Sequence, residues 1–276
     1  DSIRLHMIQD FPISFGPEEE QEQIIAFLKK QTTQFDELIA KSKAQVTLLE
    51  EKRQATINQA VTKGLDPSVP MKDSGVEWIG KIPEEWEVKR LKFLGEAIIG
   101  LTYNPSEIVD SQNGILVLRA SNIQNSLLSM KDCVFVDKKI PQKLRIKKDD
   151  ILICARNGSK HLVGKNILLD ENLIDSTFGA FMTIFRSEYA NFISKILNSQ
   201  IFKSQTGLYS TTTINQLTTS ILNNIVVAFT KNEIERNQIA EFLDKQTTQF
   251  DELIAISKVQ ITLLEEKRQA TITQAV

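Results

Sequence analysis

The chain has 276 residues, of which 25% are charged and 41% are apolar, and its net charge is −2. This is an ordinary globular composition, and it excludes a chain that binds nucleic acid through an overall positive charge. The two cysteines, Cys133 and Cys154, are too few for a disulfide framework. No signal peptide is recognisable, and no apolar run reaches the roughly 18 residues that span a bilayer. We therefore expect a cytoplasmic protein with no membrane partner.

Residues 17–63 are predicted to form one long helix. Pro17 and the three glutamates after it suit a first helical turn, and Gly64 suits the position just after a helix. Between them, apolar residues recur at steps of three and four, as they do along one face of a helix. The sequence therefore indicates a single uninterrupted helix with one apolar stripe.

Residues 64–229 are predicted to form a compact α+β domain with a curled mixed sheet. Trp78 and Trp86 are expected to anchor its loop-rich start. Residues 86–226 contain 17 lysines and arginines against 12 acidic residues, so this part carries +5 and the rest of the chain −7. Short branched or aromatic runs predict strands at 115–119, 133–136, 151–155, 166–169, 177–185 and 221–229, and helical spacing predicts a helix at 191–202.

Residues 230–276 repeat the first helix. Positions 23–61 and 238–276 are identical at 32 of 39 places, with an offset of 215 residues. Two like helices related by a two-fold axis use the same surface, so we predict that they pair as an antiparallel coiled coil. The alternative is that each helix packs on a separate globular body. The residues expected at the pairing surface are Leu28, Phe35, Leu38, Ile39, Val46, Leu49, Leu243, Phe250, Leu253, Ile254, Ile261 and Leu264.

Two long phrases resemble a known family. "VTKGLDPSVPMKDSGVEWIGKIPEEWEVKRLKFL" at 61–94 and the repeated segment ending in "TLLEEKRQATITQAV" are similar to the junction and spacer helix of the DNA-specificity (S) subunit of type I restriction–modification systems. "LRASNI", "DDILICARNG" and "INQLTTSILNNIVV" fall where a target-recognition domain of that family has comparable phrases. Residues 1–16 resemble the tail of a preceding recognition domain, most of which is missing.

The resemblance implies what the chain does and what it assembles with. A full subunit of the family alternates two recognition domains with two helices, and the helices set the distance between two DNA half-sites. The chain is then expected to bind double-stranded DNA, to read one half of a bipartite site, and to hold modification (methyltransferase) and restriction (motor-nuclease) subunits. The resemblance places S-adenosylmethionine, ATP and Mg on those partners and no cofactor on this chain. A homodimer that restores two reading domains is a further possibility.

Candidate DNA-binding residues lie in two segments and after one strand. Segment 155–165 offers arginine, lysine and histidine in a loop that Gly158 and Gly164 make flexible, and segment 209–217 offers hydroxyls and amides. Arginine can bind a guanine edge and asparagine or glutamine an adenine edge, while lysine serves phosphates more often. Ordinary solvated turns, or a cap of a helix near Asn215, are the simpler explanations. The candidates are Arg119, Asn122, Arg156, Asn157, Ser159, Lys160, His161, Lys165, Tyr209, Thr211, Thr212, Thr213, Asn215 and Gln216.

A second cationic stretch, residues 138–148, is better explained as a charged exposed face. It contains six lysines and arginines just before a predicted strand. Contact with DNA phosphates is the alternative for this stretch.

The sequence argues against catalysis by this chain. It has two histidines, His6 and His161, no cluster with metal-ligand spacing and no Walker-type phosphate loop. "YNPSE" at 103–107 has part of the Asn-Pro-Pro-aromatic pattern of adenine methyltransferases but lacks its second proline and its aromatic residue. We therefore read Asn104 as a turn residue. The competing classes are a coiled-coil scaffold whose central domain binds protein, and a stand-alone DNA methyltransferase.

Overall fold

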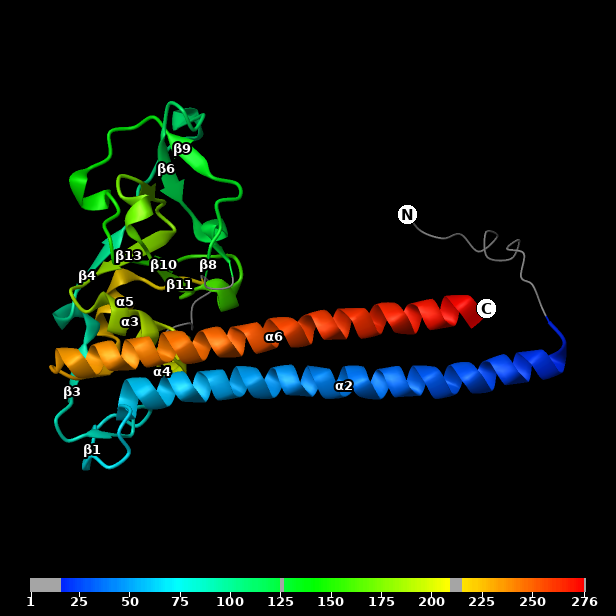
Figure 1. Cartoon of the computed structure of the whole chain (residues 1–276). Helices are drawn as coiled ribbons and strands as arrows, with labels where there is room; N and C mark the ends of the chain where they lie inside the picture. The colour runs from blue at the N-terminus through cyan, green and yellow to red at the C-terminus, as the bar shows by residue number, and fades with distance from the viewer. Residues whose placement is uncertain (1–15, 125–126, 209–214, 276) are drawn as a thin grey trace. The chain divides into compact units, whose positions relative to one another are not determined.

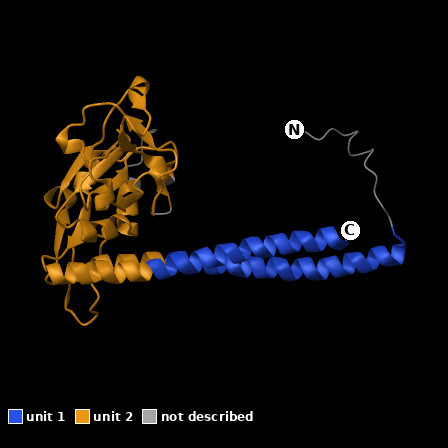
Figure 2. Cartoon of the chain, turned by 45° about the horizontal axis from the view of Figure 1, so that its top comes forward, with its two compact units in different colours: residues 1–51, 248–276 blue, residues 52–247 orange. Residues whose placement is uncertain are grey.

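The computed structural model describes residues 16–124, 127–208 and 215–275. Contacts divide the chain into two compact units, coloured separately in Figure 2. We call residues 1–51 and 248–276 the helix-pair unit and residues 52–247 the globular unit. The helices labelled in Figure 1 are α2 (Glu18–Lys63), α3 (Ala190–Leu197), α4 (Gln200–Leu208), α5 (Thr219–Asn224) and α6 (Glu233–Ala275).

The strands of the described residues are short and all lie in the globular unit. In chain order they are β1 (Met71–Asp73), β2 (Lys81–Pro83), β3 (Glu87–Arg90), β4 (Glu96–Ile99), β5 (Ile108–Val109), β6 (Ile115–Leu118), β7 (Ile123–Gln124), β8 (Leu127–Leu128), β9 (Val134–Val136), β10 (Ile151–Cys154), β11 (Asn166–Leu168), β12 (Thr177–Phe178), β13 (Met182–Arg186) and β14 (Val226–Phe229). With the long helices, they confirm the predicted mixed α+β class.

The long helices begin and end at the expected signals. Three glutamates occupy the first turn of α2, where negative charge stabilises the positive end of the helix dipole. The helix stops at Gly64, which adopts the left-handed φ of +72° and donates its N–H to the carbonyl of Ala60 at 3.2 Å. At the start of α6, the side chain of Asn232 accepts the N–H of Glu235 at 3.3 Å.

In the helix-pair unit, α2 and α6 lie side by side and run in opposite directions (Figures 1 and 2). Lys43 pairs with Glu265 at 3.0 Å, and Lys258 pairs with Glu50 at 3.5 Å. Adding the 215-residue offset to Lys43 and Glu50 gives Lys258 and Glu265. The two ion pairs therefore join equivalent positions of the two repeats, with the roles of the helices exchanged. The two helices are therefore related by an approximate two-fold axis.

The buried seam of this unit is narrower than the sequence predicted. Ile39, Val46 and Ile254 are buried, whereas Leu38 and Leu253 are each 49% exposed. Those two leucines were expected in the seam, and that prediction is wrong. A coiled-coil stripe that contains position 39 continues at 42 and 46, so its neighbour at 38 faces outward. Ser42 and Ser257 take the seam positions instead and are 7% and 6% exposed.

The other residues predicted for helix pairing divide into two groups. Leu243 is fully buried, but it lies in the core of the globular unit, together with Ile239 of α6 and Ile57 of α2. The remaining six are partly buried along the described helices. They are Leu28, Phe35, Leu49, Phe250, Ile261 and Leu264.

The described residues of the globular unit form two four-stranded sheets and three two-stranded ribbons. The first sheet has the strand order β11-β10-β13-β4 and is antiparallel throughout. The second has the order β12-β6-β9-β5 and is mixed, because β12 pairs with β6 in parallel. The ribbons are β1-β2, β7-β8 and β14-β3.

The first sheet is buried on both faces. Along β10, Ile151 and Ile153 face a core that contains Trp86 and Phe192, while Leu152 and Cys154 face a second core that contains Phe178. Successive side chains of a strand point to opposite faces, so one continuous apolar run can serve two cores. This explains why β10 reads as an unbroken apolar stretch rather than as an alternation.

Two predicted strands are wrong in part. Segment 221–229 is helix α5 followed by β14, because Thr218 caps the helix by accepting the N–H of Ile221 at 3.2 Å. Segment 177–185 is not one strand. The chain leaves β12 in the second sheet, turns through Gly179 and Phe181, and enters β13 in the first sheet.

Candidate nucleic-acid interface

A groove of about 910 Å³ lies where the chain passes between the two sheets of the globular unit. The backbones of Gly100 and Gly179 approach so closely here that a Cβ on Gly100 would lie 2.2 Å from the carbonyl oxygen of Gly179. Glycine is required by this contact, since any side chain would push the sheets apart. The groove is lined by Leu101, Thr102, Tyr103, Arg119, Ala120, Ser121, Arg156, Asn157, Gly158, Gly179, Ala180, Phe181, Met182 and Asn215.

The groove brings together residues from all three parts of the sequence that were expected to contact DNA. Arg119 follows β6, Arg156 and Asn157 follow β10, and Asn215 precedes α5. Hydrogen bonds join the segment that follows β10 to the segment that precedes α5. Leu217 N–H donates to Ala155 O at 2.7 Å, and the Asn215 side chain donates to Gly158 O at 3.0 Å.

Arg156 has the most available side chain of this set. It is exposed, and its guanidinium lies 5.3 Å from the ring centroid of Phe181. Its backbone N–H donates to the carbonyl of Phe181 at 3.0 Å, and it forms an isolated antiparallel bridge with Gln216. The side chain therefore projects from a backbone that is held on two sides.

Arg119 and Asn122 form a structural turn. The guanidinium of Arg119 donates to the carbonyl of Asp132 at 2.6 Å, and its backbone N–H donates to the side chain of Asn122 at 2.8 Å. Asn122 is fully buried and also donates to the carbonyl of Ser129 at 2.8 Å. A buried amide with these bonds has no surface left for a base edge, so Asn122 is removed from the candidates.

The other predicted contacts that the structure describes lie in or beside the loop after β10. Ser159 and Lys160 are exposed, as is Gln216. Lys165 is less available, because its ammonium donates to the carbonyl of Ile123 at 2.6 Å. His161 lies in a short 3-10 turn, Lys160–Leu162, and its side chain is not described. Tyr209, Thr211, Thr212 and Thr213 lie outside the described residues.

The cationic stretch at 138–148 is extensively neutralised. Lys138 pairs with Glu107 at 2.9 Å, Arg145 with Asp175 at 3.1 Å and Lys148 with Glu171 at 3.7 Å. Lys143 pairs with Glu96 at 2.5 Å. These acids supply countercharges along the stretch, which agrees with its interpretation as a charged exposed face.

Local electrostatics separate the groove from its surroundings. None of the described residues that line it is a carboxylate, a histidine or a cysteine, so Arg119 and Arg156 face no acid there. Behind it, burial raises the pKa of the Cys154 thiol above its ordinary value, which keeps the group neutral. Outside it, the N–H of Asn104 and the ammonium of Lys138 hold the pKa of Glu107 below its ordinary value. Asn104 begins a short 3-10 turn, as expected of a turn residue.

Sequence reasoning missed two aromatic residues of the groove, Tyr103 and Phe181. Phe181 was read as the interior of a strand, although the glycine two residues before it signals a break. Tyr103 was considered only as part of an incomplete methyltransferase pattern. An aromatic residue beside a turn glycine, in a domain with excess positive charge, is the signal that would have found both.

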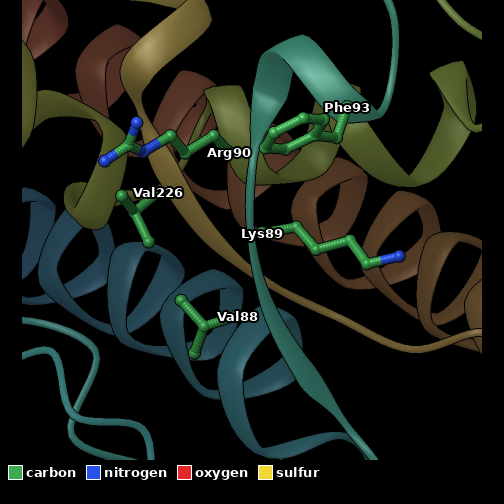
Figure 3. A pocket seen from close by; sticks show the side chains of 5 residues that line it. All are labelled: Val88, Lys89, Arg90, Phe93 and Val226. Carbon is green, nitrogen blue, oxygen red and sulfur yellow. The ribbon is translucent and has the colours of Figure 1, made fainter.

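A second hollow, of about 560 Å³, lies on the β3–β14 ribbon. Figure 3 shows its lining side chains, which are Val88, Lys89, Arg90, Phe93 and Val226. Lys89 already pairs with Glu87 at 3.3 Å, which leaves Arg90 as the main polar group. We therefore place the candidate site in the first groove.

In the described parts of the chain, no group of three or more histidines, cysteines or acids is placed to hold a metal ion. Over the same residues, no helix combines the length and the apolar character needed to cross a membrane.

The fold is that of solved subunits of type I restriction–modification systems. A chain from a structure of the assembly and conformational transition of the type I R-M system superposes with a TM-score of 0.72 at 17% identity, over 95% of this chain and 60% of that one. The HsdS subunit from Thermoanaerobacter tengcongensis superposes with a TM-score of 0.58 at 15% identity, over 95% and 59%. No protein-family model matches the chain.

Curated relatives define the class more closely. The specificity subunit of the type I restriction enzyme EcoKI of Escherichia coli (strain K12) is 29% identical over 205 residues, which is 71% of this chain and 44% of that protein. That of MjaVIII of Methanocaldococcus jannaschii is 28% identical over 274 residues, which is 95% of this chain and 60% of that protein. The resemblance seen in the sequence is thus confirmed: the curated relatives that the chain matches are type I specificity subunits, and the chain spans about half of their length.

Proposed function

We propose that the chain is a sequence-specific DNA-binding subunit of a type I restriction–modification complex and reads one half of a bipartite site. The observation that carries this proposal is the groove between the two sheets. It gathers Arg119, Arg156, Asn157 and Asn215 from three distant parts of the sequence onto one surface.

The chemistry of the groove suits duplex DNA. Two arginines that face no carboxylate match the phosphates and the guanine edge, and two asparagines can bind adenine edges. The excess of five positive charges over residues 86–226 adds a weak general attraction for the DNA backbone. Because the groups that line the groove offer contacts and no general base, we propose that the chain recognises DNA and is itself non-catalytic.

We further propose that the two long helices hold the modification and motor-nuclease subunits. Support comes from the two-fold relation of the helix-pair unit, which presents equivalent apolar side chains on two faces. Leu38 and Leu253 are each 49% exposed, and Leu48 and Leu263 are 49% and 51% exposed. Such twin surfaces fit two copies of one partner. S-adenosylmethionine, ATP and Mg would be bound by these partners, and a second copy of this chain would supply a second reading domain.

Removing the Arg156 side chain tests the groove. If Arg156 binds a base edge, Arg156→Ala should weaken binding to the cognate duplex by about 1–3 kcal/mol and relax the preference at one base pair. Fluorescence anisotropy of the complex with its modification partners measures this change. Arg145→Ala is the matched control, because it removes the same charge from the same unit while Arg145 lies outside the groove and pairs with Asp175.

Two results would contradict the proposal. The first is equal affinity of the wild-type complex for every duplex with little dependence on salt, which is the behaviour expected of a scaffold that binds protein. The second is a loss on Arg145→Ala as large as the loss on Arg156→Ala. Binding would then depend on the total charge of the unit and not on the groove.

A further inference from the structure

Phe181 is an exposed aromatic residue that belongs to none of the buried cores. Its side chain is 60% exposed, and it is absent from the three buried clusters of the globular unit. It lies in the turn between β12 and β13, at the crossing from one sheet to the other, and its side chain lines the groove. A phenylalanine this exposed contributes little to the buried cores, so its ring is available for contacts in the groove.

The backbone fixes Phe181 against Arg156 independently of their side chains. The carbonyl of Phe181 accepts the N–H of Ala155 at 2.9 Å and that of Arg156 at 3.0 Å. From the other side, Ala155 O accepts the N–H of Leu217 at 2.7 Å. A change of the Phe181 side chain leaves these bonds intact, so the turn should keep its conformation.

The Phe181 ring lies beside the guanidinium of Arg156. The central carbon of the guanidinium is over the ring, 5.3 Å from the ring centroid. A guanidinium that stacks on an aromatic face keeps its N–H groups at its edge, where they remain free for a planar acceptor. Arg119 differs, because one of its terminal nitrogens already donates to the carbonyl of Asp132. Within the described residues, the guanidinium of Arg156 therefore has an aromatic ring beside it and no acceptor bound to its N–H groups, unlike that of Arg119.

We propose that Phe181 is a positioning residue for sequence readout, which holds the Arg156 guanidinium in the plane needed for bidentate contact with a guanine edge. The proposal rests on the proposed function and adds to it a specificity determinant and the base that is read. Guanine is favoured because its O6 and N7 form the paired acceptors that a planar arginine fork matches. Stacking reduces the freedom that arginine would lose on binding, so its effect should fall on the cognate duplex alone.

The test is selection from a randomised duplex library by the full 276-residue chain in complex with its modification partners. The variants are Phe181→Ala, Phe181→Leu, Phe181→Tyr, Arg156→Ala and the double variant Phe181→Ala/Arg156→Ala. Phe181→Leu keeps an apolar side chain without a π face, and Phe181→Tyr keeps the ring. Thermal unfolding of each variant confirms that the turn is folded, and Phe181→Leu and Phe181→Tyr carry the test if Phe181→Ala does not fold.

We expect Phe181→Ala and Phe181→Leu to reduce the preference for guanine at one base pair by roughly 3- to 30-fold, at the position that Arg156→Ala also affects. Phe181→Tyr should keep the preference. Affinity for random duplex should change by less than about twofold, and the slope of affinity against salt should not change, because no phosphate contact is lost. In the double variant, the loss of Phe181 should add little to the loss of Arg156.

Several outcomes would overturn the inference. Equal weakening of all sequences by Phe181→Ala would make the ring a general part of the surface. A wild-type preference in Phe181→Leu would show that the π face is not needed, and an effect at a different base pair from Arg156 would separate the two residues. If the wild-type complex enriches no motif, the proposed function fails and this inference fails with it. If it enriches a motif that Phe181→Ala and Phe181→Leu both keep, only the inference fails.

Discussion

The globular unit and the helix-pair unit bury their side chains to very different depths. In the globular unit, Trp86, Phe178, Phe185 and Phe192 are at most 2% exposed and belong to cores that lie on both faces of a sheet. In the described residues of the helix-pair unit, only five side chains are buried, and two of these are the serines Ser42 and Ser257. The first unit is stabilised by buried volume, whereas the second depends on a narrow seam that a single position can disturb.

The largest effect is expected at the centre of the globular core. Trp86→Ala should lower the free energy of unfolding by about 3–5 kcal/mol, because it opens a cavity and deprives the half-buried Glu235 carboxylate of its indole donor. The indole N–H of Trp86 donates to both carboxylate oxygens of Glu235 at 3.1 Å, and its ring meets Phe192 edge-on. Urea unfolding followed by circular dichroism measures the change.

The second tryptophan provides the control for this prediction. Trp78 is 45% exposed, so Trp78→Ala should cost less than about 1 kcal/mol. Equal losses from the two substitutions would mean that the loop-rich start of the domain contributes as much stability as the core. Stability would then not depend on the depth at which a side chain of the globular unit is buried.

An intermediate effect is expected at the seam of the helix pair. Ile254→Ala should destabilise the pairing by about 2 kcal/mol, whereas Leu253→Ala should change it by less than about 0.5 kcal/mol. The two residues are neighbours on α6, but Ile254 is 8% exposed and Leu253 is 49% exposed. Hydrogen exchange should therefore accelerate in residues 248–275 of Ile254→Ala while the globular unit remains protected.

The pair tests the corrected seam directly, because both side chains were expected in it. Faster exchange in Leu253→Ala than in Ile254→Ala would return the seam to the face that the sequence suggested. Acceleration in both units at once would show that the two units unfold together.

The smallest effect is expected for the exposed ion pairs. Lys43→Gln and Lys258→Gln should each cost about 0.2–1 kcal/mol, since both pairs are open to solvent and screened by salt. Their approximate symmetry requires the two losses to agree within a few tenths of a kcal/mol. Thermal unfolding of the helix pair at low and high salt measures both, and clearly unequal losses would break the two-fold relation.

The long helices were predictable because periodicity, capping residues and the repeat all indicate the same structure. Helix α2 begins and ends within one residue of the predicted 17–63, and α6 begins three residues after the predicted 230. The seam was predicted less well, because apolar type alone does not separate Leu38 from Ile39. Their separation depends on which positions remain in register with a partner over several turns.

Individual residues of the groove were predictable from the sequence, but their proximity in the fold was not. Arg156 and Asn215 were identified from their chemistry and their glycine-rich or hydroxyl-rich surroundings. Their meeting depends on a tertiary bridge between segments about 60 residues apart, which local patterns do not encode. Asn122 was misjudged for the same reason, because an amide that follows a strand looks identical whether it faces solvent or closes a turn.

At the crossing near Gly179, the groups that hold the fold differ from the groups that line the groove. Main-chain bonds and the glycine contact hold the crossing in place, while the side chains at 119, 156, 181 and 215 extend into the groove. Exchanging the side chains at 156 and 181, whose positions rest on main-chain hydrogen bonds, should leave the folded body unchanged. Under the proposed function, a new target sequence could therefore be acquired by substitutions at these positions, without rebuilding either sheet.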